Sequence, residues 1–227
     1  MSESAGVVFV VDDDASVRRA LLRLFRSAGI AAEGFASADE FLTQAHPAGP
    51  CCLVLDVRMP GVTGPDLQQR LKDAGTRIPI VFLTGHGDVP LTARVMKAGA
   101  VDVLTKPVQD RTLLEAVQAA LEQDRANRAE GAALGSLQSR LRRLTPREGE
   151  VLRLVIAGLL NKQIAAELGT SERTVKVHRG RVMHKMEAGS VADLVRAAGS
   201  LGIAPHVPQA RPIPGWHHQA SAAGNRS

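Results

Sequence analysis

The first half of the chain alternates short apolar segments with longer amphipathic ones. Residues Val7 to Val11 form an unbroken apolar run, which is typical of a strand buried on both faces of a sheet. From Val17 to Phe25 the apolar positions recur at helical spacing, and Gly29 follows as a stop signal. The alternation continues and predicts strands at 30–35, 53–56, 80–83 and 101–105 and helices at 38–45, 64–74, 90–98 and 110–128. We therefore predict an α/β fold over residues 5–123, with a doubly wound, parallel, five-stranded sheet.

The pattern changes in the second half, where helical spacing continues and no strand is predicted. Residues 129–136 are small and include two glycines, which predicts a hinge within a helical linker at 124–140. Four helices are then expected in an all-α domain at 141–203, starting after the capping residues Thr145, Asn161, Ser171 and Ser190. Two of them flank the short turn Gly169-Thr170, which is typical of a helix-turn-helix. Residues 204–227 contain four prolines and little to bury, so we expect a disordered tail.

Composition places both halves in a globular protein. A length of 227 residues fits two small domains, and no apolar run approaches the roughly 18 residues that a membrane-spanning helix needs. Residues 1–4 lack the basic and apolar regions of a signal peptide, so we expect a cytoplasmic protein with no membrane partner. The adjacent Cys51 and Cys52 lie in an apolar run and are expected to be buried core residues rather than disulfide or metal ligands.

Charge is divided unevenly between the halves. Residues 1–124 contain 12 Lys/Arg and 16 Asp/Glu, whereas residues 125–227 contain 16 Lys/Arg and only 7 Asp/Glu. A basic C-terminal half indicates a polyanionic partner, although a solvated basic surface would leave the same composition.

Polar residues gather where the predicted strands end. They are Asp12, Asp13 and Asp14 after the first strand, Asp56 at the end of the third, Thr84 at the end of the fourth and Lys106 after the fifth. The carboxyl ends of parallel strands meet at one edge of a sheet, where ligands bind. Clustered carboxylates repel one another, and Mg²⁺ relieves this repulsion by taking one or two of them together with water and phosphate. The sequence therefore predicts a magnesium site at this edge.

This constellation resembles the receiver domain of response regulators. The matching segments are Val11-Asp12-Asp13-Asp14, Leu55-Asp56-Val57-Arg58-Met59-Pro60-Gly61, Leu83-Thr84-Gly85 and Thr105-Lys106-Pro107. The resemblance implies that Asp56 accepts a phosphoryl group from a sensor histidine kinase. It also implies that Mg²⁺ is held by Asp12, Asp13, Asp56 and the backbone carbonyl of Arg58, and that Thr84 and Lys106 contact the phosphate.

Two positions near this pocket have other expected roles. Asp14 is expected to cap the following helix rather than bind metal. Val103 stands where receivers commonly have a Phe or Tyr whose ring reorients with the threonine. Valine has no ring and is stiff at χ1, so we expect only a modest coupling of phosphorylation to the face formed by 90–98 and 101–105.

The third helix of the C-terminal domain, from residue 172 to about residue 186, is basic. With the segments Leu144-Thr145-Pro146-Arg147-Glu148, 158–165 and 171–178, it resembles LuxR/FixJ-type DNA-binding domains. The resemblance implies that Lys176 and Val177 face base edges, and that Thr174, Arg179, Arg181 and Lys185 hold phosphates. Gly180 stands where some relatives have a long polar side chain. His178 and His184 are expected in backbone contacts or packing rather than as metal ligands.

Together the two resemblances identify the chain as similar to FixJ-type transcriptional regulators. They imply double-stranded DNA, a sensor histidine kinase and RNA polymerase as partners, a homodimer upon phosphorylation, and activation of transcription as the usual output. Such a protein is not an enzyme, since it only accepts a phosphoryl group and slowly loses it again.

Two alternatives stay open. One is a constitutive DNA-binding protein whose receiver only dimerises, against which the full set of five pocket residues argues. The other is a metal-dependent phosphatase, in which a second carboxylate stands two residues after the nucleophile; here that position is Arg58.

Overall fold

The computed structural model describes residues 6–44, 49–85 and 89–206 of the chain. These residues belong to two compact units, residues 1–132 and residues 133–227. Within the described part, no helix is long and apolar enough to cross a membrane. The predicted tail falls mostly outside the described residues, as do Trp216, His217 and His218.

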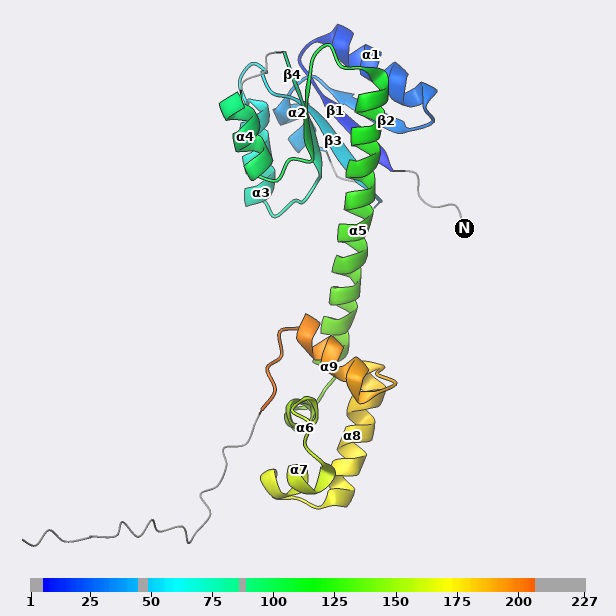
Figure 1. Ribbon diagram of the computed structural model, residues 1–227, viewed down its shortest axis with the longest axis vertical. Helices are drawn as coiled ribbons and strands as arrows, with labels where there is room; N and C mark the ends of the chain where they lie inside the picture. Colours follow the sequence, from blue (N-terminus) through cyan, green and yellow to red (C-terminus); the bar gives the residue numbers. More distant parts are fainter. Residues whose placement is uncertain (1–5, 45–48, 86–88, 207–227) are drawn as a thin grey trace, which may run out of the picture. The chain divides into compact units, whose positions relative to one another are not determined.

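The first unit is a parallel five-stranded sheet flanked by helices (Figure 1). Its elements are β1 (Val7–Val11), α1 (Ala15–Ser27), β2 (Ala31–Phe35), α2 (Ala38–Leu42), β3 (Cys51–Asp56), α3 (Gly64–Asp73), β4 (Ile80–Thr84), α4 (Val89–Lys97) and β5 (Asp102–Thr105). The strand order is β2-β1-β3-β4-β5, and every neighbouring pair is parallel. The doubly wound sheet predicted from the sequence is confirmed.

Alternate residues of each strand pack into one of two cores. Phe9, Leu53 and Phe82 face the side covered by α2, α3 and α4, where the rings of Phe9, Phe35 and Phe41 lie 5.4–6.0 Å apart. Val8, Val54, Val81 and Leu104 face the side covered by α1 and α5. This burial on both faces explains why the strands are continuous apolar runs. Cys51 and Cys52 are both free and fully buried, as expected.

Helix α5 runs from Asp110 to Arg142 and crosses the boundary between the two units. The predicted helix end near residue 128 was therefore wrong, and residues 129–136, where we predicted a hinge, are helical. Gly131 and Gly135 each cost a helix only about 1 kcal/mol relative to alanine. Their neighbours are mostly Ala, Leu, Gln and Arg, which favour helix enough to outweigh that cost.

The second unit contains four further helices, as predicted. They are α6 (Pro146–Ile156), α7 (Asn161–Glu167), α8 (Glu172–Met186) and α9 (Val191–Ser200), packed around a core that includes Val151, Ile164, Val182 and Leu194. Thr145 caps α6 in a capping box with Glu148, and Ser171 and Ser190 cap α8 and α9. Leu160 rather than Asn161 takes the N-cap position of α7, and Asn161 is the first helical residue.

The predicted tail begins with an ordered segment. The backbone N–H of His206 donates to the carbonyl oxygen of Arg153 at 3.1 Å, so the chain just after α9 returns to α6. The disordered tail predicted from residue 204 was therefore wrong for residues 204–206.

Candidate functional site

Four of the predicted pocket residues meet at the carboxyl edge of the sheet. Asp12 follows β1, Asp56 ends β3, Thr84 ends β4 and Lys106 follows β5, and these four strands are neighbours. The Lys106 ammonium bridges two carboxylates, with Nζ 2.7 Å from Oδ2 of Asp12 and 3.0 Å from Oδ2 of Asp56. Residues that are up to 94 positions apart in the sequence are therefore in direct contact.

Three carboxylates at this edge form a candidate metal site. Asp12, Asp13 and Asp56 each offer one oxygen, and these oxygens lie within 4.8 Å of one another. Asp12 and Asp56 are buried, whereas Asp13 is exposed. An all-oxygen set with an open side fits Mg²⁺, which keeps several waters and uses few carboxylates. Among the described residues this is the one cluster of acids, cysteines or histidines close enough to share a metal ion.

Burial and charge act together on the ionisable groups of this pocket. Burial raises the pKa of Asp12, and the hydrogen bond from Lys106 offsets this only in part. Burial disfavours the charged form of Lys106, but hydrogen bonds to Asp12 and Asp56 outweigh it and raise the pKa of this ammonium. Lys106 therefore remains a cation between the two carboxylates.

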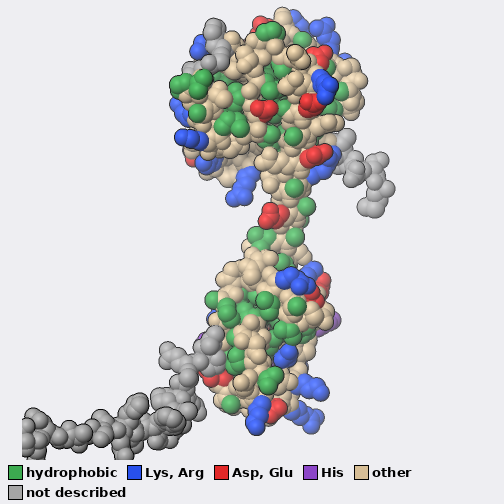
Figure 2. Space-filling model, in the orientation of Figure 1, with side chains coloured by type: hydrophobic (Ala, Val, Ile, Leu, Met, Phe, Trp, Pro, Cys, Tyr) green, Lys and Arg blue, Asp and Glu red, His purple; other side chains and the backbone are tan. Residues whose placement is uncertain are grey.

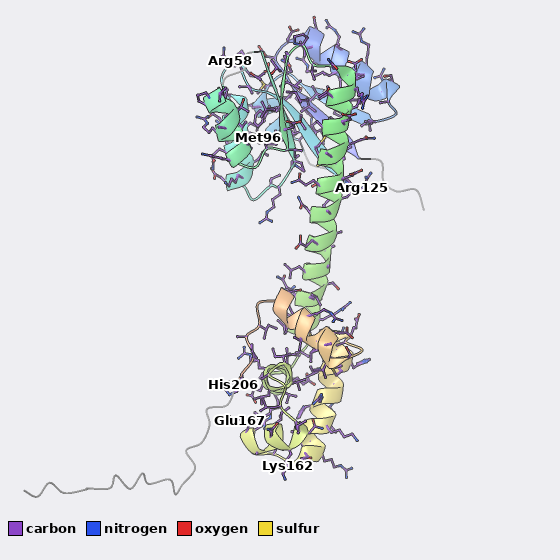
Figure 3. The ribbon with its side chains drawn as sticks, in the orientation of Figure 1. Arg58, Met96, Arg125, Lys162, Glu167 and His206 are labelled. Carbon is purple, nitrogen blue, oxygen red and sulfur yellow. The ribbon has the colours of Figure 1, made fainter. Side chains whose placement is uncertain are left out.

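The remaining pocket residues occupy the expected positions. Thr84 is 4% exposed, and its carbonyl oxygen accepts the backbone N–H of Lys106 at 2.7 Å, which aligns the ends of β4 and β5. The backbone N–H of Arg58 donates to Oδ1 of Asp56 at 3.3 Å, and Arg58 itself lies on the exposed loop that follows β3 (Figure 3). A metal contact by the Arg58 carbonyl stays a prediction. Asp14 caps α1 by accepting the N–H groups of Ser16 and Val17, as predicted.

Gly64 supports the pocket and was missed by the sequence reasoning. It begins α3 directly after the cap residue Thr63, and a Cβ added there would lie 2.4 Å from the backbone oxygen of Asp56. A side chain at this position would therefore displace the strand end that presents the Asp56 carboxylate. A glycine in the first turn of a predicted helix was the available signal, because glycine is a poor helix former.

Val103 lies in β5 and is half-buried against the same core as Leu91. It faces the α2–α4 side of the sheet, two positions before the exposed Thr105. The modest coupling expected from the absence of a ring here stays a prediction.

The basic helix α8 presents part of the predicted DNA-contacting set to solvent. Lys176, Val177 and Arg181 are exposed, and the Val177 side chain is 48% exposed. Arg179 is half-buried and donates from Nη1 to Oδ1 of Asn161 at 3.2 Å, so α7 holds it in place. Thr174 is also half-buried, and its hydroxyl is 2.9 Å from that of Ser171.

Lys185 has a partner inside the domain. Its ammonium lies 2.7 Å from Oε2 of Glu148, which is 2% exposed and also belongs to the capping box of α6. Hydrogen bonds from Lys185 and from the Thr145 backbone lower the pKa of Glu148. Lys185 thus joins α8 to α6, an interaction that the sequence reasoning did not identify.

Four further residues lie in or near α8. Lys162, at the start of α7, is exposed (Figure 3) and adds a cation to this end of the unit, where Figure 2 shows Lys and Arg side chains in blue. His178 is half-buried and its Nδ1 has no hydrogen-bond partner among the described residues, while His184 is exposed. Gly180 is exposed, with open space where a side chain would project.

Known proteins resemble both units. A family model described as "Response regulator receiver domain" matches residues 8–118, and one described as "Bacterial regulatory proteins, luxR family" matches residues 142–198. Nodulation protein W of Bradyrhizobium diazoefficiens is 52% identical over 202 residues, which are 89% of each chain. The response regulator protein TodT of Pseudomonas putida is 45% identical over 88% of each chain. The transcriptional regulatory protein FixJ of Azorhizobium caulinodans is 42% identical over 87% of this chain and 94% of that protein.

Solved structures agree with these relatives. The structure of the response regulator StyR has a TM-score of 0.79 and 47% identity, and it covers 86% of this chain and 99% of that one. Full-length FixJ from B. japonicum has a TM-score of 0.53 and 42% identity over 87% of this chain and 98% of that one. The chain belongs to the FixJ-type response regulators, transcriptional regulators in which a receiver domain is joined to a LuxR-type DNA-binding domain.

Proposed function

We propose that this regulator is switched by phosphorylation of Asp56 from a phosphohistidine of a sensor histidine kinase. One Asp56 oxygen forms the new bond to phosphorus while the phosphorus–nitrogen bond breaks, and the imidazole keeps the electron pair and takes up a proton. The observation that carries the proposal is the Lys106 ammonium, which bridges Asp56 and Asp12 at 3.0 and 2.7 Å. Phosphoryl transfer depends on positioning and charge neutralisation, and this pocket offers both. The chain acts as an acceptor rather than as an enzyme.

Mg²⁺ is the cofactor that the donor set favours. Asp12, Asp13 and Asp56 would hold it, with the backbone carbonyl of Arg58 as the fourth protein ligand. When bound, Mg²⁺ supplies positive charge next to the phosphoryl oxygens. Lys106 would supply a second positive charge, and the Thr84 hydroxyl would bond the new phosphate.

Phosphorylation would favour a homodimer through α4 and β5. Exposed apolar residues on α4 support this face, since Val89 is 76% exposed and Met96 is 42% exposed (Figure 3). Movement of Thr84 and Lys106 toward the phosphate would shift the adjoining end of β5, and Val103 would pass this on only weakly. A symmetric dimer presents two reading helices, which fits paired half-sites on DNA.

Helix α8 would read double-stranded DNA. Lys176 and Val177 are exposed on it and suit contacts to base edges, while Thr174, Arg179 and Arg181 suit phosphates. Lys185 was expected at the phosphates as well, but its pairing with Glu148 favours a role in holding α8 against α6. DNA bound in this way would place the dimer beside RNA polymerase, with activation as the output.

The phosphorylation step is tested by labelling with acetyl phosphate and Mg²⁺. Asp56→Asn should abolish the labelled band on a phosphate-affinity gel, because the nucleophilic oxygen is lost. Asp73→Asn is the matched control, since Asp73 is an exposed carboxylate at the end of α3 and should be labelled like the wild type. Undiminished labelling of Asp56→Asn would refute the assignment.

The switch is tested by sedimentation with and without beryllofluoride, which mimics the phosphoryl group. We expect the mass to double and the affinity for operator DNA to rise, with both effects absent in Asp13→Ala because its metal site is incomplete. If mass and affinity stay the same in the wild type, the chain is a constitutive DNA-binding protein instead.

A further inference from the structure

Every polar group of Asp12 is held by a hydrogen bond. Its backbone N–H donates to the carbonyl oxygen of Phe35 at 3.3 Å, and its Oδ1 accepts the backbone N–H of Asp14 at 2.9 Å. Its Oδ2 accepts from Lys106, and its backbone carbonyl oxygen accepts Nη1 of Arg18 at 2.7 Å. The contact with Phe35 continues the pairing of β1 with β2, the contact with Asp14 belongs to the turn before α1, and the contact with Lys106 belongs to the predicted pocket. Arg18 belongs to none of the motifs that predicted the pocket, so this fourth contact needs its own explanation.

The Arg18 side chain lies in a space that Gly34 leaves open. Gly34 is in the edge strand β2 and pairs with Val10 of β1. A Cβ added at Gly34 would lie 3.3 Å from Cγ and 3.5 Å from Cδ of Arg18, and 2.9 Å from Cδ1 of Leu22. The stem of Arg18 therefore runs over bare backbone of β2 and brings its guanidinium back to the end of β1. Arg18 is half-buried, whereas the next residue, Arg19, is exposed.

The carbonyl that Arg18 holds belongs to the peptide between Asp12 and Asp13. A peptide is planar, so fixing this oxygen also fixes the N–H of Asp13 and the direction in which the chain continues. The Asp13 carboxylate is exposed and lies within 4.8 Å of those of Asp12 and Asp56, which repel it in the absence of a cation. A rigid backbone at this peptide keeps the third carboxylate in place despite that repulsion.

We propose that Arg18 is a positioning residue of the acidic pocket. Arg18 holds the Asp12–Asp13 peptide so that the three carboxylates stay preorganised for a divalent cation, and Gly34 provides the room for its side chain. The inference rests on the proposed function of the pocket as a magnesium site. Arginine suits the task because its long stem packs while its charged, planar head donates at a distance. Partners that orient metal ligands in this way commonly change metal affinity or activity by about 10- to 100-fold when removed.

The test is the dissociation constant for Mg²⁺, measured on the full chain by amide-shift NMR titration with MgCl₂ and without any phosphodonor. Arg18→Met keeps most of the stem and removes every donor, and it should weaken Mg²⁺ binding by about tenfold or more. Arg19→Met is the matched control and should stay within about twofold of the wild type, because Arg19 is exposed and its guanidinium donates to the Ser16 hydroxyl rather than to the Asp12–Asp13 peptide. Arg18→Lys retains one donor nitrogen on a long chain and should recover part of the affinity.

Gly34→Ala gives an independent perturbation from the other strand. Its new methyl group must push the Arg18 stem or Leu22 aside, so we expect Mg²⁺ binding to weaken in the same direction. A purely structural role would lower the melting temperature or the folded fraction, but it would leave the dissociation constant of the folded molecules unchanged. If Arg18→Met does not fold, Arg18→Ala, which also removes every donor, replaces it with the same expectation.

The inference is overturned if the folded Arg18 variant binds Mg²⁺ as tightly as Arg19→Met does. The proposed function fails separately, if Asp56→Asn is still labelled by acetyl phosphate. Because the titration contains no phosphodonor and the labelling experiment contains no Arg18 variant, the two failures are distinguishable.

Discussion

The buried carboxylate of Asp124 should be one of the main supports of the receiver domain. Asp124 lies in α5, is 2% exposed, and accepts the backbone N–H of Cys51 at 2.8 Å and Nε of Arg128 at 2.6 Å. Arg128 also reaches Sγ of Cys51 with Nη2 at 3.5 Å. The carboxylate thus ties α5 to the first residue of β3, the strand that ends in Asp56.

Asp124→Ala should lower the free energy of unfolding because two groups lose their partner, the Cys51 backbone N–H and the Arg128 guanidinium. Cys51 is fully buried, so its backbone N–H would lose its partner without access to water, which costs about 1–3 kcal/mol. The Arg128 side chain is 36% exposed, so water can solvate its charge and the loss of the ion pair adds less than a fully buried pair would. We therefore expect the free energy of unfolding of the receiver to fall by about 2–4 kcal/mol. Asp124→Asn can still accept the Cys51 N–H and should cost less.

The two cysteines provide an assay for this domain alone. Cys51 and Cys52 are the only cysteines of the chain, and both are fully buried in the receiver. Burial also raises the pKa of each thiol, which further slows their reaction in the folded protein. Reaction with a thiol reagent across a urea series therefore reports unfolding of the receiver and is insensitive to the helical domain.

Glu122→Ala is the control for this prediction, because Glu122 is exposed on the same helix two residues earlier. Its effect should stay within about 0.5 kcal/mol. A double-mutant cycle with Arg128→Gln separates the ion pair from the backbone hydrogen bond. The reasoning would be refuted if Asp124→Ala and Glu122→Ala gave the same urea midpoint, since the carboxylate would then not hold α5 on the sheet.

Three further outcomes can be measured directly. Lys176→Ala should lose about 1–3 kcal/mol of DNA-binding free energy at one base position. Arg181→Ala should weaken the binding of all DNA sequences alike and flatten the salt dependence of binding. If both variants behaved identically on operator and random DNA in an anisotropy titration, α8 would be excluded as the helix that reads DNA. Hydrogen bonds from Lys185 and from the Thr145 backbone lower the pKa of Glu148 from its usual 4.5. The stability that these bonds supply is therefore present above pH 4.5 and is lost as the pH falls through the lowered pKa. Glu148→Gln should therefore destabilise the helical domain at neutral pH and flatten its loss of stability in acid, and an acid unfolding curve that is parallel to the wild type would contradict this. Gly64→Ala should cost about 1–3 kcal/mol and slow the labelling of Asp56, because its methyl group meets the Asp56 backbone; normal labelling kinetics would show that the strand end adjusts freely.

Much of the candidate site could be predicted because its signals are local. Asp12 and Asp56 stand at the ends of apolar runs, and parallel strands bring such ends to one edge whatever the details of packing. The cap formed by Asp14 and the capping box of Thr145 and Glu148 depend on residues two or three positions apart. Each of these features was expected from the sequence and each is present.

The continuous helix through residues 129–136 was missed for the opposite reason, because it depends on more than local signals. Gly131 and Gly135 are weak local signals, and a helix of 33 residues gains enough from its other positions to include both. Residues 129–136 alone do not show whether the low helix propensity of their two glycines outweighs the stability of the whole of α5.

What the sequence by itself determined is the succession of strands and helices along the chain, the polar residues gathered at the sheet edge and the basic character of α8. These features depend on apolar periodicity and caps, which act over a few neighbouring residues. Only the tertiary structure decided which side chains remote in the sequence meet. Lys185 pairs with Glu148 across 37 positions, and Asp124 accepts the backbone of Cys51 across 73. Arg18 reaches back to the strand that precedes its helix because Gly34, on a third element, leaves it room. Such contacts depend on distances between packed elements, and no pattern of neighbouring residues encodes those distances.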